Sequence, residues 1–437
     1  MVVISESWKL SSDIEPNTSD FLDKALHRFS ERYRLAEPSV LAFVEEESRF
    51  KRIRQETDEL RNRFMGRTKP PLYGMPFGVK DLFHIEGLPT GAGSKLPSSV
   101  LTGIEGSLIR RLREQGAWFP GKTVTEEFAY AGSISTRNPQ ALEHTPGGSS
   151  AGSAASVASG MCPVAIGTQT LRSVTAPASF CGVTGFKPSY GRISMDGVIL
   201  LAPSMDTAGI FTVDINSLSI VMPHLISDWN VQQGSHPYDP ERKPVLGIPS
   251  GIYMELMGDE IRAAFEKQTT TLIQAGYTVR TVEMPWDDSF IYGDAMLRFI
   301  QGEMARVHEQ WFNEHKDQYG DAVLQAILTG KTIDDEELVN YRIEQQRLQR
   351  KLAEFRREQG IDLWISPAQG GVAPPHGGKT GWAGMTAIWT FAGLPTMSLA
   401  VGQVEGLPLG FQCIAEFGQD EILMKHAEKI ARLLTME

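Results

Sequence analysis

The groups best suited to nucleophilic chemistry are serine side chains in two runs of small residues and one lysine in an apolar segment. The runs are residues 146–153 and 168–182, and the lysine is Lys80. A serine hydroxyl is a poor nucleophile unless a base removes its proton. A lysine can be that base only when burial lowers its pKa from about 10.4. Because Phe77 and Val79 precede Lys80 closely, this segment could supply the apolar surroundings of a Ser–Lys site.

Each of these segments also has an ordinary interpretation when it is taken alone. Most lysines are solvated surface charges, and Gly/Ser runs are more often flexible linkers. A serine after a strand is usually a hydrogen-bonded turn residue. Residues 148–152 also satisfy the G-x-S-x-G pattern of α/β-hydrolase nucleophile elbows, which requires a buried strand before the serine. Pro146 disfavours such a strand, because proline lacks the N–H that a sheet needs.

The combination and order of several motifs resemble the amidase signature family, and the resemblance covers most of the chain. The family hydrolyses amides through a Ser–Ser–Lys triad. The resemblance implies Ser173 as the nucleophile, Ser149 as the proton relay after a cis peptide bond, and Lys80 as the base. The two serines are 24 residues apart, as in the family. The matching segments are residues 74–81, 121–123, 127–129, 146–153, 168–182, 185–192, 204–209, 393–395 and 406–412.

The loop before Ser173 departs from the family pattern. The resemblance implies an oxyanion hole made of the backbone N–H groups of Thr170, Leu171, Arg172 and Ser173. The family usually has small residues, often glycines, where this chain has Leu171 and Arg172. Glycine reaches backbone conformations that cost other residues about 1–2 kcal/mol. If the loop tolerates the larger residues, the Arg172 guanidinium could contact a substrate carbonyl or carboxylate. If the loop is distorted, the loss of one oxyanion donor typically lowers the rate ~10²–10³-fold. We favour the first outcome because all three triad residues are present.

The resemblance, together with alternating helix and strand patterns, predicts one α/β domain over residues 1–437. We expect a mixed central sheet sandwiched between helical layers. Residues 1–66 are expected to form an N-terminal helical segment, and residues 67–215 the signature core. Residues 331–360 have the apolar periodicity of an amphipathic surface helix, and residues 117–120 read as a strand.

Composition favours a cytoplasmic protein and disfavours several classes of partner. The net charge of −11, from 42 basic and 53 acidic residues, argues against a general affinity for nucleic acid or anionic membranes. Three scattered cysteines argue against a disulfide framework or a zinc site. No apolar run approaches the ~20 residues of a membrane span, and the first residues do not resemble a signal peptide.

The resemblance implies hydrolysis of a small or medium linear amide, aryl amide or carbamate, without metal or cofactor. Four aromatic residues, Phe128, Tyr130, Trp382 and Trp389, lie in segments that line family pockets, although each could equally belong to the core. Two alternatives stay open. One is the amidotransferase subunit that releases ammonia from glutamine within a complex. The other, supported only by Leu171 and Arg172, is a non-catalytic binding protein on a decayed amidase scaffold. A homodimer is left open as an assembly.

Overall fold

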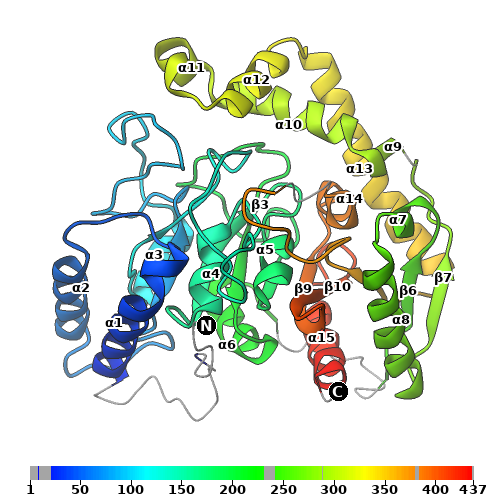
Figure 1. Ribbon diagram of the computed structural model, residues 1–437, viewed down its shortest axis with the longest axis horizontal. Helices are drawn as coiled ribbons and strands as arrows, with labels where there is room; N and C mark the ends of the chain where they lie inside the picture. Colours follow the sequence, from blue (N-terminus) through cyan, green and yellow to red (C-terminus); the bar gives the residue numbers. More distant parts are fainter. Residues whose placement is uncertain (1–7, 9–20, 231–241, 288, 379–382, 436–437) are drawn as a thin grey trace.

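The computed structural model describes Trp8 and residues 21–230, 242–287, 289–378 and 383–435. These residues form one ten-stranded sheet with helices on both faces (Figure 1). The predicted α/β class with a mixed central sheet is therefore confirmed. The helices are α1 Phe21–Val40, α2 Arg49–Arg63, α3 Ser107–Glu114, α4 Ala151–Ala158, α5 Thr175–Cys181, α6 Ile215–Leu225, α7 Ile252–Glu255, α8 Asp259–Gln274, α9 Ser289–Tyr292, α10 Asp294–Val307, α11 Glu309–His315, α12 Asp321–Gly330, α13 Asp335–Glu358, α14 Gly384–Phe391 and α15 Asp420–Leu434, with a 3₁₀ turn at Lys316–Gln318. The strands are β1 Phe77–Lys80, β2 Lys122–Thr123, β3 Val164–Gln169, β4 Thr184–Lys187, β5 Thr207–Thr212, β6 Leu246–Pro249, β7 Val279–Val282, β8 Leu363–Pro367, β9 Thr396–Val404 and β10 Leu407–Ile414.

The sheet combines parallel ends with an antiparallel middle. Its strand order is β2-β1-β3-β5-β4-β9-β10-β8-β6-β7. Strand β1 is parallel to both β2 and β3, and β6 is parallel to both β7 and β8. The strands between β3 and β8 pair antiparallel. Every residue of β1 and β3 is buried, as expected for strands covered by helices on both faces.

Close packing of α4 against the sheet depends on small residues. A Cβ on Gly152 would lie 2.1 Å from the carbonyl oxygen of Ala42 and 2.4 Å from the amide nitrogen of Val124. On β1, a Cβ on Gly78 would lie 3.2 Å from the Ser156 hydroxyl of α4. Because helix and sheet approach this closely, the N-terminus of α4 reaches the carboxyl ends of β1 and β3, which lie side by side.

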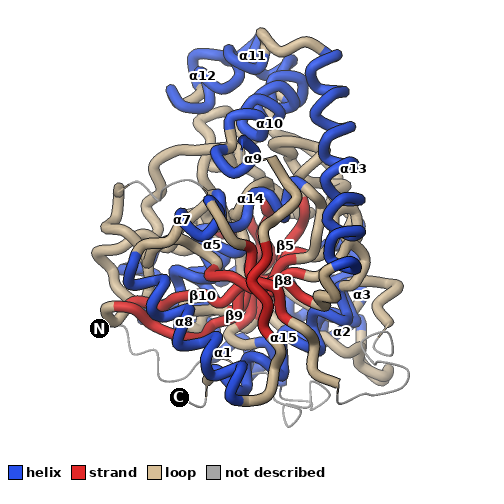
Figure 2. The backbone as a smooth tube through the Cα atoms, turned by 90° about the vertical axis from the view of Figure 1, so that its right-hand side faces the viewer, coloured by secondary structure: helices blue, strands red, loops and turns tan. Residues whose placement is uncertain are grey.

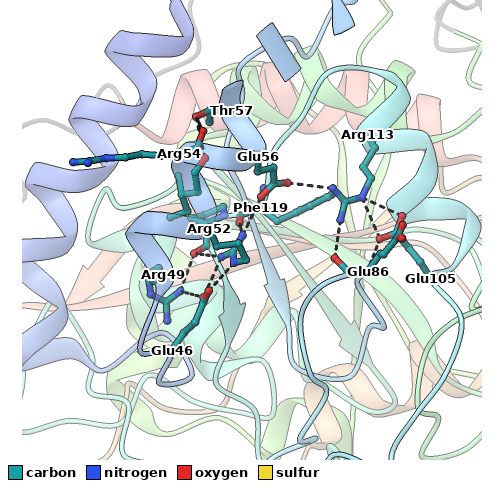
Figure 3. Close-up of polar contacts among 12 residues, drawn as sticks. Glu46, Arg49, Arg52, Arg54, Glu56, Thr57, Glu86, Glu105, Arg113 and Phe119 are labelled. Carbon is teal, nitrogen blue, oxygen red and sulfur yellow. Dashed lines mark hydrogen bonds and ion pairs between the residues drawn. The ribbon is translucent and has the colours of Figure 1, made fainter. Parts of the chain in front are cut away.

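A network of charged side chains joins α2 to α3 and to the segment before β2 (Figure 3). Arg52 of α2 forms ion pairs with Glu46 at 2.6 Å and with Glu56 at 3.0 Å. Glu56 also pairs with Arg113 of α3 at 3.2 Å, and Arg113 pairs with Glu105 at 3.1 Å. The charges in this network compensate one another, so we assign it a structural role.

Helices α10 to α12 lie beyond one end of the body in both views, and α13 returns toward the sheet (Figures 1 and 2). Helix α13 occupies most of the segment expected to be an amphipathic surface helix. Its N-cap Asp334 accepts a hydrogen bond from the amide of Glu337 at 2.8 Å. Near its other end, the Phe355 ring stacks on Trp364 of β8, with 6.3 Å between the centroids. The helix is therefore docked on the body along one face.

The prediction of a strand at residues 117–120 is wrong. This segment makes only an isolated bridge, between Trp118 and Pro76, and the neighbouring strand β2 starts at Lys122. Pro120 has no backbone N–H to donate to a sheet.

None of the helices in the described ranges has the combination of length and apolar sequence that a membrane span requires.

Candidate active site

Lys80 is fully buried at the end of β1, where its ammonium nitrogen meets three hydroxyl groups. Nζ donates hydrogen bonds to Ser149 Oγ at 2.8 Å, to Thr168 Oγ1 at 2.8 Å and to Ser150 Oγ at 3.0 Å. The Lys80 side chain has none of its surface exposed. The structure thus brings together two of the three residues predicted to form a triad, and it adds two hydroxyls that the sequence reasoning did not single out.

Burial lowers the pKa of Lys80 from its ordinary value of 10.5 to about 7. Burial disfavours the charged ammonium. The carboxyl groups of Glu126 and Asp206 act in the opposite direction, because they favour the charged form. Near neutral pH the amine can therefore be unprotonated in a large fraction of molecules, which is the state that a general base requires.

Ser149 lies just before helix α4, and the Gly148–Ser149 peptide bond is cis, as the resemblance implies. The residues just before it form no strand, only isolated bridges between Asn138 and Ala141 and between His144 and Pro375. The nucleophile-elbow interpretation of this run therefore lacks the strand it needs. The next residue, Ser150, donates to the carbonyl of Thr168 at 3.1 Å, which ties the start of α4 to the end of β3.

Ser173 follows β3 in a loop that forms one wall of a cavity of about 370 Å³. The side chain of Ser173 is half-buried. The same cavity is lined by the other three residues predicted to form the oxyanion hole with Ser173, namely Thr170, Leu171 and Arg172. Gly148 also lines it, so the loop and the residue preceding Ser149 share one space.

Gln169 holds the loop from the side of α14. Its Nε2 donates to Thr390 Oγ1 at 2.9 Å, and its Oε1 accepts from the amides of Val174 at 2.9 Å and Thr175 at 3.0 Å. Thr390 Oγ1 in turn donates to the carbonyl of Leu171 at 2.8 Å. These hydrogen bonds fix the Leu171 carbonyl and the amides of Val174 and Thr175. They thereby restrict the orientation of the loop N–H groups between them.

Asp206 also holds the loop, through Thr170. Its carboxyl accepts from Thr170 Oγ1 at 2.5 Å and from the amides of Leu201 at 2.6 Å and Ala202 at 3.0 Å. Burial raises the pKa of Asp206 to about 6 despite these hydrogen bonds.

Leu171 and Arg172 do not occupy the left-handed backbone region. Within the part of the chain that the structure describes, the non-glycine residues with positive φ are Leu41, Ala92, Phe128, Ala129 and Glu405. The glycines usual at the two loop positions are therefore not needed here for a left-handed conformation, and the loop accommodates both side chains.

Arg172 and Glu126 bring opposite charges to the cavity wall. Arg172 Nη1 donates to Gln369 Oε1 at 3.1 Å. Burial raises the pKa of Glu126 to about 7, and the charges of Lys80 and Arg172 lower it. Glu126 was not among the predicted site residues, although it directly precedes the Glu127-Phe128-Ala129 motif.

The four predicted aromatic contacts have different environments. Tyr130 lines the cavity and accepts a hydrogen bond from Gln301 Nε2 at 3.0 Å. Phe128 is buried against His308, with 4.4 Å between the ring centroids, and Trp389 is buried against Trp364. Neither Phe128 nor Trp389 is among the residues that line the cavity, and Trp382 lies outside the described residues.

The described ranges contain no group of three or more His, Cys, Asp or Glu side chains that could hold a metal ion. The three cysteines are buried and unpaired.

A sequence profile of the Amidase family matches residues 24–424. The chain belongs to the Amidase family. The resemblance inferred from the motifs is thereby confirmed, and the family contains both hydrolases and amidotransferase subunits.

Individual relatives of both kinds align along nearly the whole chain. A crystal structure of an amidase superposes with a TM-score of 0.81 at 31% identity, covering 94% of this chain and 95% of that one. The peptide amidase from Stenotrophomonas maltophilia has a TM-score of 0.79 at 23% identity and covers 97% of both chains, which shows the shared fold. A glutamyl-tRNA(Gln) amidotransferase subunit from Sulfurihydrogenibium sp. (strain YO3AOP1) is 26% identical, over 98% of both chains.

Proposed function

We propose that this member of the Amidase family is a cofactor-independent amidohydrolase that cleaves the C–N bond of a linear amide or carbamate. The observation that carries the proposal is the 2.8 Å hydrogen bond from buried Lys80 to Ser149, beside the cavity that Ser173 lines. A buried lysine with its pKa lowered to about 7 is suited to remove a proton near neutral pH.

In the proposed first step, Ser173 Oγ attacks the substrate carbonyl carbon and forms a C–O bond. The proton of Ser173 passes to Ser149, whose own proton passes to Lys80 Nζ. Backbone N–H groups of Thr170 to Ser173 stabilise the negative oxygen of the tetrahedral intermediate.

In the second step, the C–N bond breaks and the leaving nitrogen takes a proton from Ser149, which Lys80 reprotonates. The acyl group then remains on Ser173. A water molecule then attacks the ester carbonyl and passes a proton through Ser149 to Lys80. The C–O bond to Ser173 breaks, Ser173 takes back a proton by the same route, and the acid is released.

A panel of linear amides, aryl amides, carbamates and esters tests this proposal through product release. We expect turnover by the wild type and by Ser194→Ala, since Ser194 is exposed and its hydroxyl donates to Asp196 Oδ1 at 2.6 Å. Ser173→Ala should be inactive. A well-folded wild-type protein that hydrolyses no member of the panel would contradict the proposal.

A second candidate is an amidotransferase subunit that releases ammonia from glutamine, because a glutamyl-tRNA(Gln) amidotransferase subunit aligns over 98% of both chains. Glutamine-specific hydrolysis that appears only with co-purifying subunits would favour this candidate. The non-catalytic alternative rested on Leu171 and Arg172, and their φ values outside the left-handed region weaken it.

A further inference from the structure

The Glu126 carboxyl is built into the wall of the cavity beside the residues proposed to be catalytic. An ideal Cβ on Gly148 would lie 2.3 Å from Glu126 Oε1 and 2.6 Å from its Cδ. The carboxyl therefore occupies the space that any side chain at position 148 would need. The backbone amide of Glu126 also donates to the carbonyl of Ser149 at 3.2 Å. These two contacts fix Glu126 relative to the Gly148–Ser149 peptide.

Arg172 also lines this cavity and carries the opposite charge, and the charges of Arg172 and Glu126 act on each other. The residue directly precedes Ser173, and its guanidinium is held by Gln369 Oε1 at 3.1 Å. Gln369 is itself buried. The fork of a guanidinium presents several N–H donors in one plane, whereas the Glu126 carboxylate, which is ionised above its pKa of about 7, only accepts. The cavity lining therefore includes both hydrogen-bond donors, from Arg172, and an acceptor, from Glu126.

The remaining lining is largely apolar and includes Ala129, Leu201, Leu297 and Ile300. A ligand with a net charge would leave either Glu126 or Arg172 facing a like charge in a poorly solvated space, and such mismatches are costly. A neutral ligand group that both donates and accepts hydrogen bonds would satisfy both residues.

We propose that Glu126 and Arg172 form a specificity pair that selects compact, uncharged substrates carrying a second carboxamide or ureido group. The carbonyl oxygen of that group accepts from Arg172, and its NH₂ group donates to Glu126. This inference rests on the proposed function, because it names the substrate class of that site. It assigns Glu126 a role in selecting the substrate, in addition to the effect of its charge on the pKa of Lys80.

Binding to the Ser173→Ala variant tests the pair without requiring turnover. The probes are succinamide, succinamate and β-alaninamide, which share one carboxamide and differ in the charge of the second group. Titration calorimetry at about pH 8.5 keeps the carboxyl ionised, because this pH is above the Glu126 pKa of about 7. We expect succinamide to bind at least about tenfold more tightly than either charged probe, as for one charge-assisted hydrogen bond.

Two substitutions in the Ser173→Ala background should change this preference in opposite directions. Glu126→Gln should shift the ratio of affinities toward succinamate by at least about tenfold, and Arg172→Met should shift it toward β-alaninamide by a similar factor. Glu127→Gln is the matched control, because the Glu127 carboxyl accepts from the amide of Gly320 at 3.1 Å and does not line the cavity. If Glu126 and Arg172 had only a structural role, each substitution would lower the affinity for all three probes together and leave the ratios of affinities unchanged.

The proposal is overturned if no probe binds, if the order of affinities is unaffected by both substitutions, or if L-glutamine binds more tightly than succinamide. The last result would favour the amidotransferase candidate. These outcomes are distinct from failure of the proposed function, which is measured by turnover in the protein with Ser173 intact.

Discussion

Lys80 Nζ lies 2.8 Å from Ser149 Oγ in a fully buried environment. The nearby hydroxyls of Ser150 and Thr168 complete a set of three acceptors for the ammonium group. When the amine is neutral it has a lone pair, which can accept a proton from one of these hydroxyls. The proposed chemistry depends on this relationship more than on any other contact in the molecule.

Lys80→Met should lower kcat by at least about 10³-fold, because the variant keeps the volume of the side chain but removes the base. Lys187→Met is the matched control. Lys187 is also fully buried with a pKa lowered to about 7, yet its Nζ donates to the carbonyl of Pro188 at 2.7 Å, outside the cavity lining. We expect this control to lose thermal stability rather than kcat. Comparable losses of kcat in the two folded variants would contradict the role of Lys80.

The acid limb of the pH–rate profile should reflect Lys80. A base must be unprotonated, so kcat/KM should be nearly constant above about pH 7 and should fall about tenfold per pH unit well below it, given a Lys80 pKa of about 7. A profile that stays flat down to about pH 5 would show that no group with this pKa acts as the base.

Glu126→Gln should move that acid limb to lower pH. The Glu126 charge raises the pKa of Lys80, so removing the carboxylate lowers the pKa of the amine and leaves it neutral at more acidic pH. Glu127→Gln should leave the limb in place, because Glu127 is not among the groups that shift the Lys80 pKa. Steady-state rates at a series of pH values measure both variants. A shift to higher pH in Glu126→Gln would mean that the coupling has the wrong sign.

Thr390→Val should loosen the loop before Ser173. The substitution removes the donor to the carbonyl of Leu171 and the acceptor for Gln169 Nε2. Because the loop amides are proposed to act mainly in the transition state, kcat should fall by about tenfold or more with little change in KM. Thr270→Val, on the exposed side of α8, serves as the control. A rise in KM at unchanged kcat would indicate that the loop positions substrate instead.

Much of the fold, and the closeness of Lys80 to Ser149, could be predicted from the sequence. Lys80 and Ser149 lie in segments in which chemistry and close packing restrict the residue types. Gly78 on β1 and Gly152 on α4 are examples of positions restricted by close packing. The strand expected at residues 117–120 failed because Pro120 interrupts pairing, even though its neighbours are apolar.

Glu126 and the two buried aromatics show what sequence reasoning could not decide. The contact of Glu126 with Gly148 arises from the approach of separate segments, and nothing local distinguishes Glu126 from Glu127. Phe128 packs against His308 rather than facing the cavity, because its position depends on the helices that cover it. An aromatic residue suits a core and a pocket equally well, so its type alone does not separate the two.

The most direct test of the central claim is the intact mass of the protein after incubation with a serine-reactive fluorophosphonate. We predict a single adduct on the wild type and on Ser194→Ala, none on Ser173→Ala, and strongly slowed labelling of Lys80→Met. Absence of an adduct on the folded wild type, or an adduct that persists in Ser173→Ala, would contradict an activated Ser173 beside the Lys80–Ser149 pair.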